Sequence, residues 1–419
     1  MTEREEFKEF KYFDEDFRHH FRILRNAYPN VFSVLEYELR KMHAGRYNEM
    51  KLEKVARRFG AKKLFKDRIR SHMNNRVFEA ISKKSTIENA SYICQINKFP
   101  HISKLISETL TPNQAREAEK RAIRLHALYR QRLAATGIVG RLFRFAVNLN
   151  KRDITGSHNF LQNEEKRIRD FISIISQWIS QNNILFIIAQ GDYMAHQRIL
   201  VSACRRSSVP FMVIAHGYIQ DPKLVPIAPV QGHVLFVWSE EQRKALVRAG
   251  IPEETVAFVG NPQANLVIDA PKKDTALICW HPLGSIKSDA EEINDINLIV
   301  DKLCAHIAVK FRPHPKDYDR FSTTDISNSI NTSISMNNFY QDLASAQAVV
   351  GTTSSTLIEA VSNRRSTTQI EGYASVGFEK IKTKRAADLE FSDIIRADEV
   401  SEDLTKPFNA LAAINRAFL

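Results

Sequence analysis

Short apolar runs alternate with helical patterns through much of the chain after residue 160. Four runs rich in β-branched and aromatic residues, Ile184–Ala189, 210–215, 234–238 and 256–260, are separated by segments whose apolar positions recur every three or four residues. Runs of this length predict buried strands, and their alternation with helices predicts parallel pairing in one sheet. We therefore expect a doubly wound α/β domain over residues 86–270.

The same rhythm returns after a polar stretch at 262–274, which predicts a linker. Strands are expected at 276–280, 306–311, Ala348–Gly351 and 367–370, with helices between them. These segments predict a second α/β domain over residues 271–400, so that two Rossmann-type domains face each other across a cleft.

The two ends of the chain are predicted to be helical. Residues 1–85 repeat apolar positions at three- and four-residue spacing and form a helical, basic extension. A strand over 92–96 follows, and then a long basic helix. The tail, residues 401–419, is expected to pack as a helix on the first domain.

Composition supports a two-domain globular protein. The chain has 419 residues, 43% of them hydrophobic and 26% charged, and single cores rarely grow beyond about 250–300 residues. Its four cysteines form no C-x-x-C pair and no metal-ligand spacing with histidine, so no metal site is expected. The apolar runs fall short of the ~20 residues of a membrane span, and the first thirty residues lack the apolar core of a secretory signal. We expect a cytoplasmic protein.

Positive charge is concentrated in two segments. The formal net charge is +12, and the segment from Arg40 to Lys84 has fifteen lysines and arginines against four acidic residues. Residues 116–152 have ten against two. A basic face attracts polyanions, and we expect residues 40–84 and 116–132 to hold the protein against the inner face of the cytoplasmic membrane through anionic lipid, or against an acidic glycan. A solvated helical face is the alternative.

A histidine between two prolines ends one predicted strand, in the sequence Arg312-Pro313-His314-Pro315. Prolines stiffen the loop and hold His314 outward, at the strand edge where open α/β sheets bind ligands. A histidine held beside a phosphate can donate a hydrogen bond or a proton to the leaving group. Arg312 is a further candidate phosphate ligand, and a structural turn histidine is the alternative for this motif.

Five hydroxyl residues follow Gly351 at the start of a predicted helix. One such residue would be an ordinary N-cap, but five exceed what a cap needs. Hydroxyls and free N–H groups at a helix N-terminus suit phosphate oxygens. The candidate phosphate ligands here are Thr353, Ser354, Ser355 and Thr356.

The first predicted domain offers a candidate base. His216 and Gly217 follow one strand, and Asp192 follows its neighbour. His216 could deprotonate an acceptor hydroxyl, since histidine titrates near neutral pH. Asp192 is a second candidate base, or the group that orients His216. A histidine satisfied at a strand end is the alternative.

Four residues are expected to line the cleft between the domains. The first is Gly217, which allows a turn or a close approach of a ligand. Asn261 ends the last strand of the first domain, although Asn-Pro is also a common turn. His281 and Ser285 belong to a small flexible loop after the first strand of the second domain.

Several familiar signatures are missing from the sequence. It has no G-x-x-x-x-G-K-[ST] loop, no G-x-G-x-x-G after a strand and no G-x-S-x-G elbow. Nucleoside triphosphate hydrolysis, dinucleotide redox chemistry and serine hydrolysis are therefore disfavoured, and no cofactor is expected.

Taken in order, the motifs at Asp192, His216, Asn261, His314 and 353–356 resemble those of bacterial GT-B glycosyltransferases. The His-Pro and Ser-Ser/Thr pair resembles that of sialyltransferases, polysialyltransferases, Kdo transferases and CDP-glycerol glycerophosphotransferases. The resemblance implies that His314 and the hydroxyl turn hold the phosphate of a CMP- or CDP-linked donor, and that His216 is the base. It implies transfer of a sugar or sugar acid to a glycan acceptor in capsule or lipopolysaccharide synthesis.

Two other functions stay open. The layout also resembles UDP-N-acetylglucosamine 2-epimerases, but their Gly-Asp-Ser-Gly-Gly turn reads Gly-Thr-Thr-Ser-Ser at 351–355. The chain also departs from the sialyltransferases, because it lacks their acidic motif; Asp192 is the nearest acidic site. A basic nucleic-acid-binding protein without catalysis is the third alternative, yet no recognised nucleic-acid module is present and no nucleic acid is expected as a partner.

Overall fold

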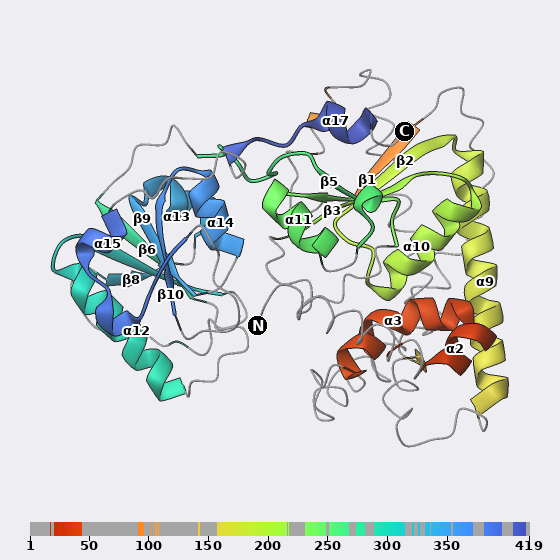
Figure 1. Cartoon of the computed structure of the whole chain (residues 1–419), viewed down its shortest axis with the longest axis horizontal. Helices are drawn as coiled ribbons and strands as arrows, with labels where there is room; N and C mark the ends of the chain where they lie inside the picture. Colours follow the sequence, from red (N-terminus) through yellow and green to blue (C-terminus); the bar gives the residue numbers. More distant parts are fainter. Residues whose placement is uncertain are drawn as a thin grey trace, which may run out of the picture.

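The computed structural model describes part of the chain, and the account below concerns these residues. They are 17, 21–43, 91–95, 102, 105–106, 108, 141–142, 157–215, 217, 231–248, 251–267, 274–280, 289–314, 321, 326, 332–335, 337–352, 355–371, 381–395 and 405–415. Within them, two parallel β-sheets form two separate lobes (Figure 1). Two Rossmann-type α/β domains preceded by helices confirm the predicted GT-B-like fold class.

The first sheet follows the order of the chain. Its strands are β1 (Ser91–Gln95), β2 (Ile184–Ala189), β3 (Phe211–Ile214), β4 (Val234–Val237) and β5 (Val256–Phe258), and each pairs in parallel with the next. The helices that follow β2 and β4 are α10 (Ala195–Arg206) and α11 (Glu240–Arg248), and α9 (His158–Gln181) precedes β2. Every residue of β3 and β4 is buried, as an apolar strand covered on both faces should be. The described strands show no reversal of order, so the doubly wound order expected for this domain is not seen among them.

The second sheet has the doubly wound order. Its strands are β6 (Thr275–Trp280), β7 (Ala308–Pro313), β8 (Thr332–Ile334), β9 (Ala348–Gly351), β10 (Ser366–Ile370) and β11 (Lys382–Lys384). They lie side by side as β11-β10-β9-β6-β7-β8, all parallel. This order reverses between β6 and β9, which is the point where such sheets bind ligands.

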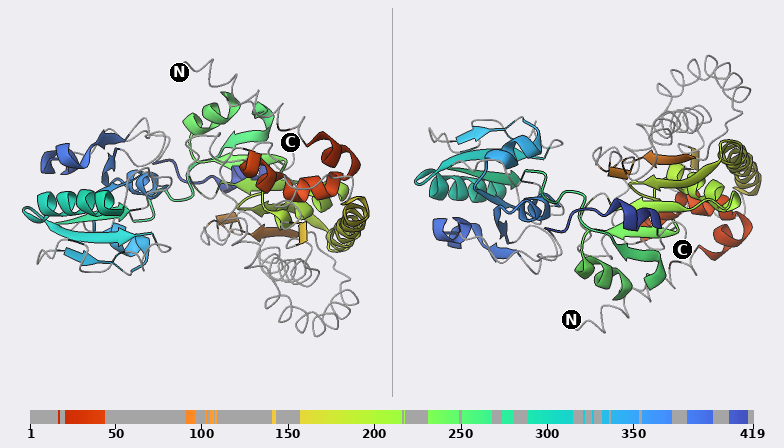
Figure 2. Two further views of the ribbon diagram at one scale, coloured as in Figure 1. Left: turned by 90° about the horizontal axis from the view of Figure 1, so that it is seen from below. Right: turned by 90° about the horizontal axis from the view of Figure 1, so that it is seen from above.

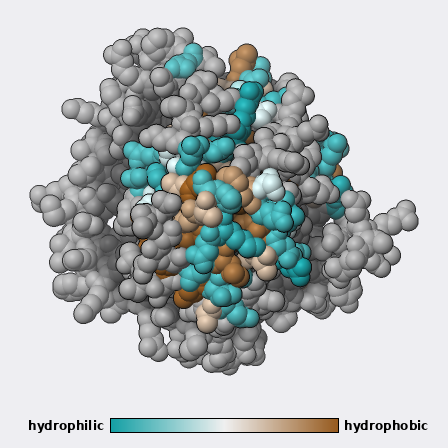
Figure 3. All heavy atoms as spheres, turned by 90° about the vertical axis from the view of Figure 1, so that its left-hand side faces the viewer, coloured by the Kyte–Doolittle hydropathy of each residue, from teal (hydrophilic) through white to brown (hydrophobic). Residues whose placement is uncertain are grey.

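Four helices accompany the second sheet. These are α12 (Asp289–Cys304), α13 (Phe339–Ser345), α14 (Ser355–Ser362) and α15 (Phe391–Ile395), with 3₁₀ turns at Ala386–Asp388 here and at Glu253–Thr255 in the first domain. The outer end of this lobe shows hydrophobic residues interspersed among hydrophilic ones (Figure 3).

The N-terminal helices belong to the core of the first domain. The helix α3 (Pro29–His43) lies against α9 and α10, and α2 (Arg22–Ala27) packs on α3 (Figure 1). Phe17, Leu24 and Val31 are fully buried in the same hydrophobic cluster as Ile168 of α9. The described part of residues 1–85 is therefore not a separate layer, because its apolar face is buried against the first sheet's helices.

The chain crosses between the lobes twice, at neighbouring places (Figure 2). The outward crossing leaves β5, and the return crossing leads to α17 (Ala410–Asn415) on the first domain. The two crossings meet where Asn261 N–H donates to Lys406 O at 2.8 Å and Asn409 N–H donates to Val259 O at 2.7 Å. Phe408 and Ala413 enter the hydrophobic cluster that contains the first sheet. The first domain is thus built from both ends of the chain.

Candidate functional site

The carboxyl edge of the second sheet brings two of the sequence motifs together. In the sheet, Trp280 at the end of β6 lies opposite Pro313 of β7, and Cys279 lies opposite Gly351 of β9. The N–H of His314 donates to Trp280 O at 2.9 Å. His314 and the turn after Gly351 therefore stand on the two sides of the end of β6, at the reversal of strand order.

The hydroxyl turn begins in close contact with β6. A Cβ on Gly351 would meet Cys279 O at 2.5 Å, so only glycine allows β9 to come this near. The next residue, Thr352, is fully buried, and its N–H donates to Cys279 O at 3.3 Å. The helix α14 begins three residues later at Ser355. The first N–H groups of this helix have no partner within the helix itself, so its N-terminus is a place for an anion.

Thr356 has an internal partner. Its buried hydroxyl interacts with the Cys279 thiol, at the end of the neighbouring strand. Burial raises the pKa of Cys279 to about 12, so this thiol stays protonated and is no nucleophile. Phosphate binding by Thr356 would rely on its position in the first turn of α14.

Arg312 is committed to an internal ion pair. Its guanidinium donates to Asp342 Oδ2 at 3.0 Å and to Asn337 O at 2.5 Å, and it lies over the Phe339 ring. Asp342 is fully buried and accepts a further hydrogen bond from Ser335 Oγ at 2.5 Å. In the described contacts, Arg312 therefore neutralises a buried carboxylate. These contacts give no support to the prediction that Arg312 binds a phosphate.

Asp192 anchors a loop in the first domain. Its side chain is 2% exposed, and one carboxylate oxygen accepts from the N–H groups of Gln231 and Gly232 at 2.5 and 2.8 Å. The strands β2 and β3 are neighbours, as the sequence predicts, so Asp192 and Gly217 follow adjacent strands. A buried carboxylate with two amide donors is fixed in place, which suits an orienting group better than a mobile base.

Asn261 sits in the crossing between the lobes. It is 1% exposed, and its side-chain oxygen accepts from the N–H of Gln263 at 2.8 Å. It also forms an isolated bridge with Pro407 of the return crossing. These contacts are those of a buried turn, and they leave little of Asn261 for a ligand.

Five predicted site residues lie outside the described residues, and the side chain of a sixth does too. The five are His216, His281, Ser285, Thr353 and Ser354, and the sixth is Ser355. Most of the basic segments 40–84 and 116–132 lies there as well. Arg40 is described, and it is 3% exposed with its guanidinium on Glu36, so it adds nothing to a basic surface.

A network of hydrogen bonds joins the outward crossing to the second domain close to α14. No pattern in the sequence predicts it. The Tyr340 hydroxyl bonds the Glu359 carboxylate at 2.9 Å and also contacts the side-chain oxygen of Gln263. Asn363 donates to Gln263 O at 2.8 Å and accepts from Val267 N–H at 2.9 Å. Burial, followed by the charge of Glu359, raises the pKa of Tyr340. The outward crossing is thereby fixed to the second domain by neutral hydrogen bonds.

The described residues contain neither a cluster of metal ligands nor a membrane-spanning helix. No group of three or more His, Cys, Asp or Glu side chains there could hold a metal ion. No helix in that part of the chain is long and apolar enough to cross a membrane.

No protein-family model and no curated protein sequence matches the chain. Among solved structures, it is similar to the UDP-GlcNAc 2-epimerase from Neisseria meningitidis bound to UDP-GlcNAc, with 11% identity over 78% of this chain and 99% of that one and a TM-score of 0.48. It is also similar to the S. aureus MnaA–UDP co-structure, with 14% identity, 60% and 80% coverage and a TM-score of 0.44. A third is the apo form of the lipopolysaccharide outer core galactosyltransferase WaaB, with 13% identity, 52% and 67% coverage and a TM-score of 0.35. These values are too low to transfer a function.

Proposed function

We propose that this protein is a glycosyltransferase that uses a nucleotide-activated sugar. One observation carries the proposal: His314 and the start of α14 flank the end of β6 where the strand order of the second sheet reverses. An anionic ligand at this point would meet free backbone N–H groups and an imidazole together. A departing nucleotide phosphate has the charge that such a site stabilises.

The second domain would hold the donor and the first domain the acceptor. His314 would donate a hydrogen bond or a proton to the phosphate oxygen as the bond to the sugar breaks. The base would come from the edge after β3, where His216 is our candidate, with Asp192 fixing the adjacent loop. We favour a CMP- or CDP-linked donor over a UDP-linked one, and a bacterial surface polysaccharide as product.

The proposal is tested by replacing His314 with alanine. Turnover should be measured with CMP-, CDP- and UDP-linked sugars and a mixed pool of surface-glycan acceptors. We expect His314→Ala to lower turnover by about 10²–10⁴-fold, the usual contribution of a positioned acid or base. His306→Ala is the matched control. His306 is an exposed histidine that precedes the amino-terminal end of β7, and its ring is stacked on Phe391.

Two results would contradict this assignment. Equal turnover of the two histidine variants would remove His314 from the reaction. Formation of a new epimer from a UDP-N-acetylhexosamine without any acceptor, followed by proton NMR, would favour the epimerase instead.

A further inference from the structure

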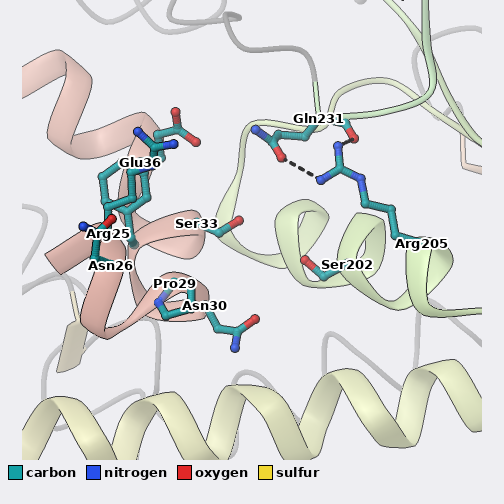
Figure 4. A pocket seen from close by; sticks show the side chains of 10 residues that line it. Arg25, Asn26, Pro29, Asn30, Ser33, Glu36, Ser202, Arg205 and Gln231 are labelled. Carbon is teal, nitrogen blue, oxygen red and sulfur yellow. Dashed lines mark hydrogen bonds between the residues drawn. The ribbon is translucent and has the colours of Figure 1, made fainter. Parts of the chain in front are cut away.

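A pocket of about 400 Å³ lies in the first domain, away from the second sheet. Figure 4 shows its two walls: Arg25, Asn26 and Ser33 come from α2 and α3, and Ser202 and Arg205 come from α10. Arginine, amide and hydroxyl groups thus meet around one hollow. Each of them can form a hydrogen bond with a hydroxylated ligand, and the arginines can also bind an anion.

Among the described residues that line this pocket, the one acidic side chain is Glu36, and it is paired with arginine. Glu36 is 5% exposed, and one of its carboxylate oxygens accepts from Arg40 at 3.0 Å. The other lies 3.4 Å from the guanidinium of Arg198, which is 1% exposed. Two buried arginines therefore face the buried carboxylate of Glu36.

The Arg198 guanidinium is incompletely satisfied. Its contact with Glu36 is an ion pair, and within the described residues none of its nitrogens has a hydrogen-bond acceptor. A buried guanidinium in this state is costly unless negative charge lies nearby. With Arg25 and Arg205 at the rim, the region around the pocket favours an anion.

The pocket is joined to the strand edge where we place the acceptor. Arg205 donates to the backbone oxygen of Gln231 at 2.6 Å and to its side-chain oxygen at 3.3 Å (Figure 4). The N–H of Gln231 in turn donates to Asp192, directly after β2. The next residue, Tyr193, packs on Tyr37 of α3 with ring centroids 4.8 Å apart, beside Glu36. A ligand in the pocket would therefore lie next to the loop that Asp192 anchors.

We propose that this pocket binds an acidic sugar unit. Its carboxylate pairs with Arg25 and Arg205, and its hydroxyls bond Ser33, Ser202 and Asn26. The size of the pocket fits one or two sugar rings, and its polar lining suits several hydroxyls at once. We take this acidic sugar to be part of the acceptor glycan, and this step rests on the proposed function. The acceptor would then be anionic.

The test is direct binding without any nucleotide. Glucuronate, glucose and inorganic phosphate are titrated into the full chain and followed by isothermal calorimetry at low and high salt. We expect glucuronate to bind, glucose to bind much more weakly, and Arg205→Ala and Arg25→Ala to weaken glucuronate binding by about tenfold each. The matched controls are Arg206→Ala and Arg22→Ala, exposed arginines on the same helices that do not line the pocket; they should bind as the wild type does.

Several outcomes would overturn the proposal. Equal losses in Arg205→Ala and Arg206→Ala would reduce the effect to general surface charge. Phosphate binding as tightly as glucuronate would make this a simple anion site, and no binding of glucuronate would remove it. Failure of the proposed function can be recognised separately, because nucleotide binding by His314→Ala and Arg205→Ala is also measured by calorimetry. We expect His314→Ala to weaken nucleotide binding and Arg205→Ala to leave it unchanged.

Discussion

The carboxyl edges of the two sheets differ in how they are built. The second sheet reverses its strand order between β6 and β9, so a gap for a ligand arises from topology alone. The described strands of the first sheet follow chain order, and the polar groups at their edge, Asp192 above all, are used to hold loops. Its pocket is formed with the added helices α2 and α3. A sheet can therefore offer a binding edge by strand order, or acquire a pocket from helices packed beside it.

The largest expected effect concerns the rigidity of the second edge. Asp342 is fully buried and neutralises Arg312 and Lys310, with N···O distances of 3.0 and 3.5 Å. Asp342→Ala should destabilise the second domain by about 3 kcal/mol, because it leaves two cations without their partner. Urea unfolding followed by hydrogen exchange would locate the loss. Asp388→Ala, which removes an exposed partner of Arg385, should cost far less.

The result also separates the two domains. If the two domains are stabilised independently, Asp342→Ala lowers hydrogen-exchange protection in β6, β7 and β9 and leaves the protection of β2 and β3 unchanged. A uniform loss of protection over both sheets would mean that the domains unfold as one unit. The two domains would then not differ in stability.

A smaller effect is expected at the contact between the domains. Tyr340→Phe removes the hydroxyl that contacts Gln263 of the outward crossing and bonds Glu359, and it should cost about 1 kcal/mol. The matched control is Tyr28→Phe, since the Tyr28 hydroxyl is hydrogen-bonded to His158 within the first domain. Small-angle scattering should show a changed domain arrangement for Tyr340→Phe only. The same change in both variants would assign the effect to stability rather than to this contact.

The smallest effect is a pH dependence in the first domain. Partial burial, and then the charge of Arg205, lower the pKa of His233 in the folded state. The unfolded chain therefore takes up the proton first, and stability falls as pH drops through the usual histidine pKa of about 6.5. His233→Gln should flatten this part of the stability curve between pH 7.5 and 5.5, measured by urea midpoints. An unchanged curve would show that other groups set the dependence.

The sequence predicts the buried strands well because they are continuous apolar runs. β2 and β9 lie at the predicted residues, and β3, β4, β6 and β10 agree within one or two. The strand β7 is shifted toward the Arg-Pro pair, since its last residues extend the pairing with β6. The edge strands β8 and β11 were missed because they are short and largely polar, with the sequences Thr-Ser-Ile and Lys-Thr-Lys.

Strand order and polar partners could not be predicted from the pattern. Alternating strands and helices require parallel pairing, but both chain order and reversed order satisfy that requirement. The motif residues were found at strand ends, whereas the groups that pair with them come from distant segments. The Asp342 carboxylate pairs with Arg312, and backbone N–H groups at Gln231 and Gly232 bind Asp192. Such pairings depend on the three-dimensional path of the chain and have no periodic signal.

The hydrogen bond from Asn409 to Val259 O has a consequence for the ancestry and engineering of this chain. The described strands and helices of the second domain all fall between these two residues, so this domain is topologically an insertion into the first, with entry and exit one hydrogen bond apart. An inserted domain whose two ends meet can be exchanged as a cassette without stretching its host. Chimaeras that join a different second lobe at Val259 and Asn409 should keep the first domain folded.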